Sequence, residues 1–235
     1  MVDLHTHILC GVDDGARTVE DSLQMLRMER EQGVDTVVLT PHFYRDRQRP
    51  EHFLDARKRA AETLFGAVDA LDAAEKETMP QMILGAEVAW RPNMSQWEDL
   101  DAFCIAGTRN LLLELPFVPW DAHLCNALYD LMNRTGVTPI LAHLERYIPL
   151  QDKGQVREIL SLGLPAQITA QQFLHHRTRG NALKALKNWA YVVATDCHDC
   201  KDRKPAMADA MAVVQKRLGR HTVEALDETA RSLLR

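Results

Sequence analysis

The strongest constraint on the fold is a repeated alternation of short apolar runs with longer amphipathic stretches, separated by polar or Gly- and Pro-containing turns. Short apolar runs are typical of buried strands, and apolar residues at helical spacing are typical of surface helices. Strands that alternate with helices predict a mainly parallel sheet, and seven such units can close into a barrel. The predicted strands are Val2–Leu4, Thr36–Leu39, Gln81–Leu84, Leu111–Leu113, Pro139–Leu141, Ala166–Ile168 and Tyr191–Ala194.

Capping signals and periodicity predict the helices between these strands. Thr18 followed by Asp21 resembles a capping box, and Gly33 ends the helix that begins there. No linker or sequence repeat divides the chain, so residues 1–235 are expected to form one α/β domain. The other predicted helices are Glu51–Ala74, Ala122–Thr135, Lys153–Leu162, Asn181–Lys187, Ala206–Leu218 and Val223–Leu234.

The composition argues against several classes of partner. The chain has 28 Lys and Arg residues against 33 Asp and Glu, a net charge of -5, and so lacks the basic surface that nucleic acid requires. It shows no secretory signal pattern and no apolar run of membrane-spanning length. Its five cysteines, an odd number, do not form a disulfide framework. We therefore expect a cytoplasmic protein that does not insert into membranes.

Histidines and carboxylates follow nearly every predicted strand. In barrels and open parallel sheets the carboxyl ends of the strands meet on one face, so these side chains are expected to converge. Imidazole and carboxylate are ligands of zinc, manganese and iron. Only the sixth strand, which leads into Gln167 and Thr169, offers no strong ligand. The candidate ligands are His5, His7, His42, Glu87, Glu114, His143, Asp196 and His198.

Local sequence adds detail to this expectation. Alternation along an extended segment points His5 and His7 to the same side, where both can bind one ion. Asp13 and Asp14 lie in a glycine-flanked turn that can fold over the same pocket. Glu114 lies inside an apolar run, where an acid requires a cation nearby. A single histidine is more often structural than a ligand, but this many ligand types at consecutive strand ends favour a metal cluster.

Five blocks of the sequence contain most of these candidate residues: Asp3-Leu4-His5-Thr6-His7, Thr40-Pro41-His42, Gly85-Ala86-Glu87, residues 142–147 and Thr195-Asp196-Cys197-His198. Together they resemble the PHP (polymerase and histidinol phosphatase) superfamily of metal-dependent phosphoesterases. The resemblance runs over essentially the whole chain. Val12-Asp13-Asp14-Gly15 and His143-Leu144-Glu145-Arg146-Tyr147 are similar to the branch of bacterial tyrosine-protein phosphatases encoded with capsule and exopolysaccharide genes.

This resemblance implies a distorted seven-stranded barrel, similar to a TIM barrel, that holds three divalent cations, which are manganese, iron or zinc. The implied substrate is phosphotyrosine in a protein or peptide, typically the tail of a bacterial tyrosine kinase that regulates polysaccharide export. Asp13 stays open as the alternative to Asp14. The implied ion sites are His5, His7, Glu87 and Asp196; Glu114 and His143, bridged through Glu87; and Asp14, His42 and His198.

Three further residues are candidates for roles in the reaction, in which a cation-activated water hydrolyses the phosphate ester. Arg146, close after His143, and Arg203, close after His198, carry the planar guanidinium that suits a phosphate. Asp199 or a metal-bound water is the candidate proton donor.

Other functions share the same ligands. These are a phosphatase of a small-molecule monoester such as histidinol phosphate, a phosphodiesterase, and a non-catalytic metal-binding module. Cys197 and Arg203 also have the spacing of cysteine-dependent tyrosine phosphatases, but no glycine lies between them to form a phosphate loop.

Overall fold

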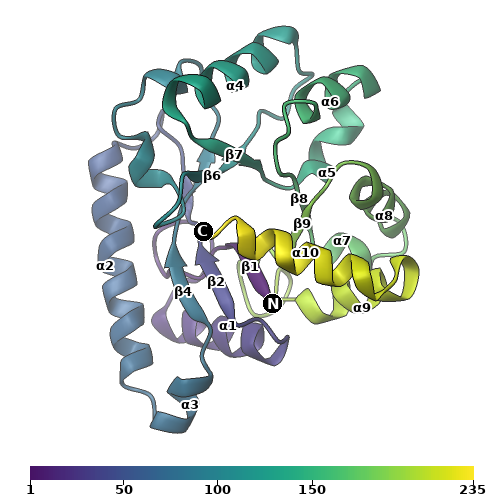
Figure 1. Cartoon of the computed structure of the whole chain (residues 1–235). Helices are drawn as coiled ribbons and strands as arrows, with labels where there is room; N and C mark the ends of the chain where they lie inside the picture. The colour runs from purple at the N-terminus through teal and green to yellow at the C-terminus, as the bar shows by residue number, and fades with distance from the viewer.

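The computed structural model describes residues 1–235 as parallel strands with helices arranged around them (Figure 1). One sheet has the order β1-β2-β4, a second has the order β3-β5-β6-β7, and β8 pairs with β9. This arrangement confirms the predicted α/β class and its parallel sheets, whereas the closed seven-stranded barrel stays a prediction. The strands are β1 Val2–Thr6, β2 Thr36–Leu39, β3 His42–Phe43, β4 Gln81–Leu84, β5 Glu87–Ala89, β6 Asn110–Glu114, β7 Thr138–Leu141, β8 Gln167–Thr169 and β9 Val192–Ala194.

Two strands, β3 and β5, were not predicted from the sequence. Each continues the course of a predicted strand after a two-residue interruption, at Thr40-Pro41 and at Gly85-Ala86. Strands of two or three residues are too short to show an alternating pattern. Their pairing matters for the site, because His42 and Glu87 are direct partners in the parallel register.

Isolated bridges connect segments at the sheet edges. Leu141 at the end of β7 bridges to Ala166, just before β8, and Thr6 bridges to Cys197, just after β9. The His7 N–H donates to the Cys197 carbonyl at 2.9 Å, and the Asp196 N–H donates to the His5 carbonyl at 2.9 Å. The carboxyl ends of the first and last strands therefore lie side by side.

The helices follow the predicted order with one clear correction. Thr18 and Asp21 form the predicted capping box of α1. The single helix predicted at Glu51–Ala74 is wrong, because the Asp72 side chain accepts the Glu75 N–H and starts a separate helix. The short helices α5 and α7 were not predicted. The helices are α1 Val19–Glu31, α2 Pro50–Asp69, α3 Ala73–Thr78, α4 Ala122–Thr135, α5 Leu144–Tyr147, α6 Lys153–Leu160, α7 Gln171–Leu174, α8 Arg179–Asn188, α9 Met207–Leu218 and α10 Arg220–Ser232.

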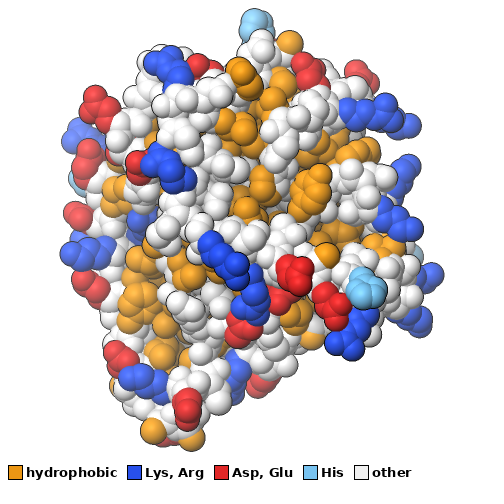
Figure 2. Space-filling model, viewed as in Figure 1, with side chains coloured by type: hydrophobic (Ala, Val, Ile, Leu, Met, Phe, Trp, Pro, Cys, Tyr) orange, Lys and Arg blue, Asp and Glu red, His pale blue; other side chains and the backbone are white.

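Helix α10 covers the amino-terminal end of the strands, where the two chain termini lie close together (Figure 1). The Asp227 carboxylate accepts the N–H of Val2 at 2.9 Å, and Ala230 packs in a buried cluster with Val2 and Leu4. This face carries interspersed positive and negative side chains (Figure 2). None of the helices has both the length and the apolar character needed to cross a membrane. With the amino-terminal end covered, the carboxyl ends of the strands are left for a site.

Candidate metal centre

The predicted ligands come from distant parts of the chain and meet at the carboxyl ends of the strands. Six are buried, His42 and Glu114 are partly buried, and Asp14 has 66% of its side chain exposed. Their positions follow the strand ends: His5 in β1 and His7 just after it, His42 in β3, Glu87 in β5, Glu114 at the end of β6, His143 after β7, and Asp196 and His198 after β9.

The ligand atoms of His5, His7 and Glu87 form one tight group, and Asp196 borders it. The Nε2 atoms of His5 and His7 lie 3.0 Å apart, which confirms that the two side chains point the same way. Glu87 Oε2 lies 3.2 Å from His5 Nε2 and 3.4 Å from His7 Nε2, and Asp196 Oδ1 lies 3.4 Å from each. Ligand atoms about 2.1 Å from a tetrahedral cation lie about 3.4 Å from one another. The spacing of the His5, His7 and Glu87 ligand atoms fits one divalent ion.

Glu87 connects this group to a second one. Its other oxygen, Oε1, lies 2.9 Å from His143 Nε2, which in turn lies 3.5 Å from Glu114 Oε1. Glu87, Glu114 and His143 place ligand atoms close enough to hold one ion together. The two oxygens of one buried carboxylate thus face two neighbouring groups.

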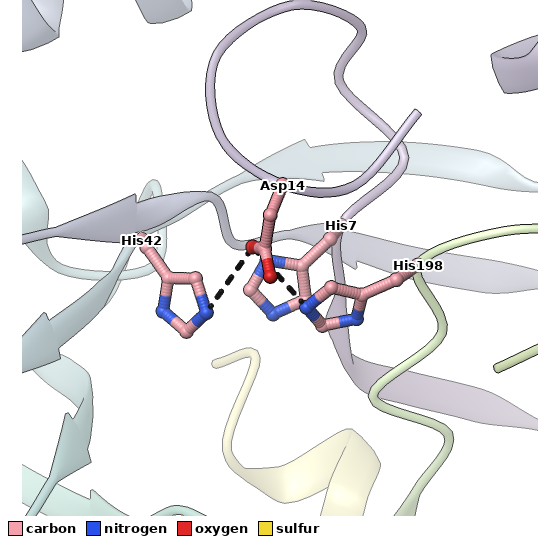
Figure 3. A group of neighbouring side chains, drawn as sticks. All are labelled: His7, Asp14, His42 and His198. Carbon is pink, nitrogen blue, oxygen red and sulfur yellow. Dashed lines mark ion pairs between the residues drawn. The ribbon is translucent and has the colours of Figure 1, made fainter. Parts of the chain in front are cut away.

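A third group shares His7 with the first. Asp14 extends from the loop after β1 and lies between the rings of His42 and His198 (Figure 3). Its Oδ1 is 3.6 Å from His42 Nε2 and 3.5 Å from His198 Nε2. The His7 and His198 ring centroids are 3.8 Å apart. His7, Asp14, His42 and His198 form a further candidate ion site, so His7 borders two groups.

Some of the candidate ligand atoms also lack hydrogen-bond partners, which fits the binding of cations. Buried polar atoms are normally paired, yet Glu87 Oε2 and His198 Nε2 have no hydrogen bond. Both atoms face other candidate ligands instead. Bound cations are the partners that such a set of imidazoles and carboxylates would satisfy.

Backbone strain marks two of the candidates. His143 has φ +32° and Asp196 has φ +53°, in a region that non-glycine residues rarely adopt. Such strain persists only where surrounding contacts impose it, and it is frequent at functional sites. The strained backbone turns each side chain sharply at the end of its strand.

Asp13 and Asp14 face different partners. Asp13 Oδ2 lies 2.6 Å from His7 Nδ1 and accepts the His42 N–H at 2.9 Å. Orienting the second nitrogen of a ligand histidine is the usual role of such a carboxylate. A Cβ atom at Gly15 would lie 2.1 Å from the His7 carbonyl, so glycine is required for the loop to approach this closely.

Sequence reasoning missed Gln167. This side chain is fully buried in β8, its Oε1 accepts the His143 N–H at 2.7 Å, and the same oxygen lies 3.2 Å from His5 Nδ1. It therefore holds two candidate ligands in place from the strand that offered none. The available signal was a polar residue inside an apolar strand.

A second buried layer was also missed. Asp3 accepts the N–H groups of His5 and Thr195, each at 3.1 Å, and the Thr195 hydroxyl lies 3.2 Å from Glu29 Oε1. Burial, and then the neighbouring Asp3, raise the pKa of Glu29 well above its usual range. This layer joins α1 to the segment that carries Asp196.

The carboxylates of the first group stay ionised. Burial opposes the charge on Glu87, but His5 and then His143 lower its pKa well below the usual range. Burial likewise opposes the charge on Asp196, and His5 and His7 lower its pKa. The group therefore keeps the negative charge that attracts cations.

The histidines respond in opposite directions. Burial lowers the pKa of His143, but Glu114 and Glu87 outweigh it and raise the value to about 9. Burial and the neighbouring His7 lower the pKa of His198 to about 4. His198 is therefore neutral at pH 7, the form that binds metal.

The predicted arginines lie beside the centre. Arg146 and Arg203 bind the same Asp196 Oδ2 at 2.6 and 2.9 Å, and their side chains are 38% and 36% exposed. Asp199 instead accepts the backbone N–H groups of residues 201–203. Burial raises the pKa of Asp199, but these hydrogen bonds lower it by more than burial raises it. The carboxylate is therefore ionised.

A family model for capsular polysaccharide synthesis proteins, CpsB/CapC, matches residues 1–234 of the chain. The chain belongs to the CpsB/CapC family. This membership confirms the resemblance to capsule-associated phosphatases that the sequence blocks indicated.

Individual members of the CpsB/CapC family are similar over their full length. The tyrosine-protein phosphatase YwqE of Bacillus subtilis (strain 168) is 30% identical, over 100% of this chain and 92% of the relative. The tyrosine-protein phosphatase CpsB of Streptococcus agalactiae is 27% identical, over 100% and 98%. A solved structure, described with YwqE from B. subtilis and CpsB from Streptococcus pneumoniae as unique metal-dependent tyrosine phosphatases, matches with a TM-score of 0.84 and 26% identity, over 100% of this chain and 94% of that chain.

The cysteine spacing does not make this CpsB/CapC member a cysteine-dependent enzyme. Cys197 is fully buried, and its Sγ lies 3.5 Å from Glu29 Oε1. Burial, and then Glu29, raise the pKa of the thiol well above its usual value. A neutral buried thiol is not a nucleophile.

The raised pKa of His143 predicts a loss of stability in alkali for the chelator-treated protein. Its value in the fold is about 9 against an ordinary 6.5, so the stabilisation is complete below pH 6.5 and is lost as the pH rises through 9. Urea denaturation should show the free energy of unfolding falling by about 1 kcal/mol or more over this interval. The fall in the free energy of unfolding should be smaller in His143→Gln than in the wild type. Equal falls in the two proteins would contradict the raised pKa of His143.

Proposed function

We propose that the chain is a metal-dependent protein-tyrosine phosphatase that hydrolyses phosphotyrosine monoesters. The observation that carries the proposal is the group of His5, His7 and Glu87, whose spacing suits a divalent cation and which Asp196 borders. The relatives support the substrate class, since they are named tyrosine-protein phosphatases, and the family model is one of capsular polysaccharide synthesis.

We assign three divalent cations, manganese, iron or zinc, to the three groups. Glu87 bridges the first two groups with its two oxygens, and Asp14, not Asp13, is the ligand of the third, because Asp13 is engaged with His7. Divalent cations bound there supply positive charge that clamps phosphate oxygens and lowers the pKa of water. The assigned ligands are His5, His7, Glu87 and Asp196; Glu87, Glu114 and His143; and Asp14, His42 and His198.

The arginines are proposed to bind the phosphate of the substrate. A guanidinium has five N–H donors, so Arg146 and Arg203 retain donors after each binds Asp196. Hydrolysis forms a bond from water oxygen to phosphorus and breaks the bond from phosphorus to the tyrosine oxygen, which takes up a proton. A phenolate with a parent pKa of about 10 leaves with little acid assistance. The ionised state of Asp199 favours water over Asp199 as the source of that proton.

The proposal extends to the fold and the cellular setting. We propose one domain in which the three sheets are segments of a distorted seven-stranded barrel, supported by the bridges from Leu141 to Ala166 and from Thr6 to Cys197. A buried cluster that draws on β1, β2, β6, β7 and β9 supports the same arrangement. Free cysteines support a cytoplasmic location, where the tail of a tyrosine kinase of capsule synthesis would be the substrate.

Substrate preference tests the proposed function. The purified protein with manganese should hydrolyse a phosphotyrosine peptide faster than histidinol phosphate, a phosphoserine peptide or a phosphodiester, measured as kcat/KM. A chelator should abolish the activity, manganese should restore it, and Cys197→Ser should leave it unchanged. Activity that persists in a metal-free sample, or a preference for histidinol phosphate, contradicts the proposal.

Glu87→Gln tests the assigned bridge. The change removes the charge shared by two ion sites, so elemental analysis should find at least one ion fewer per chain than in the wild type. Activity on the phosphotyrosine peptide should fall by about a hundredfold or more. Glu62→Gln, which changes an exposed carboxylate on α2, is the matched control. Wild-type metal content in Glu87→Gln would rule out the bridging role.

A further inference from the structure

Three exposed apolar side chains gather beside the metal centre. Phe117 and Val118, 47% and 54% exposed, lie on the loop between β6 and α4, and Leu150, 44% exposed, lies just beyond α5. The whole chain has only five exposed large hydrophobic residues, so three of them belong to this one region. An exposed apolar group bordered by polar residues marks a binding surface. We call Phe117, Val118 and Leu150 the rim patch.

Hydrogen bonds fix the backbone of the rim patch. Gln151 Nε2 donates to the Val118 carbonyl at 2.9 Å, and Gln151 Oε1 accepts the Trp120 N–H at 2.6 Å. Because Leu150 directly precedes Gln151, these bonds keep Leu150 near Val118. The loop is thus anchored, and it presents Phe117 to solvent from a fixed backbone.

Phe117 also lies beside one candidate metal ligand, His143. Its ring stacks on the ring of His143, with centroids 5.8 Å apart and planes inclined by 20°, and lies 5.1 Å from the ring of Tyr147. His143 Nε2 lies 2.9 Å from Glu87 Oε1. Arg146, from the same short helix as Tyr147, binds Asp196. The exposed ring of Phe117 therefore packs against the short helix that carries Arg146, the proposed phosphate-binding residue.

We propose that the rim patch holds the phenyl ring of the phosphotyrosine substrate, with Phe117 as the residue that sets the preference for aryl over alkyl phosphates. This inference rests on the proposed function and names how its substrate class is selected. A phosphate bound beside Arg146 carries its ester group outward, and an aryl group there packs against Phe117 as an offset aromatic pair. The short side chain of phosphoserine provides no such contact.

Binding of two inert phosphonates tests the inference without relying on turnover. Phenylphosphonate and methylphosphonate share the phosphate-like group and differ in the ring. Calorimetry on the manganese-loaded protein should show phenylphosphonate binding about tenfold more weakly to Phe117→Ala than to the wild type. Methylphosphonate affinity and metal content should be unchanged. Phe117→Leu, which keeps an apolar side chain in the loop, should give an intermediate loss.

A matched control is Tyr129→Ala, which removes another exposed aromatic ring, 60% exposed on α4. It should leave both affinities unchanged. The kcat/KM for a phosphotyrosine peptide should fall in Phe117→Ala, whereas the kcat/KM for glycerol phosphate should not.

The other outcomes overturn the inference. Equal weakening of both phosphonates, or metal loss in Phe117→Leu, would assign Phe117 to support of the metal centre. If Phe117→Ala binds phenylphosphonate as tightly as the wild type but sediments with a lower mass, the rim patch is assigned to contact with a second copy of the chain. A wild type that binds phenylphosphonate selectively but does not hydrolyse phosphotyrosine peptide would refute the proposed function and leave the rim patch assignment standing.

Discussion

The contact of one buried carboxylate, Glu87, with surrounding imidazoles is the interaction on which the site depends. Its Oε2 faces His5, His7 and His42, and its Oε1 faces His143. Burying this many ionisable groups is unfavourable unless they are paired or bound to metal. The arrangement therefore makes sense as a cage for cations, and the surrounding structure serves to hold the cage in place.

The fold meets this demand by bringing many strand ends together. The parallel pairing of β3 with β5 sets His42 beside Glu87, and the bridge from Thr6 to Cys197 sets the segment around Asp196 beside β1. Gln167 lies on β8, the one predicted strand that carries no candidate ligand, and its side chain accepts the His143 N–H. Helix α10 covers the other end of the strands, so the strand ends that carry charge are the ones left accessible.

Much of this was predictable from sequence, because periodicity and strand-end position are local properties. They located the segments that carry all nine candidate ligands, and they correctly oriented His5 and His7. They did not reveal β3 and β5, which are too short for a pattern, or the helix break capped by Asp72. Nor did they reveal the contacts of Gln167 with His5 and of Arg146 with Asp196, because each joins residues distant in the chain.

Anomalous X-ray scattering from crystals grown with manganese tests the central claim most directly. The account predicts three peaks at the strand ends. One should lie among His5, His7, Glu87 and Asp196, one beside Glu114 and His143, and one among Asp14, His42 and His198. A map with no peak at these strand ends would contradict the account.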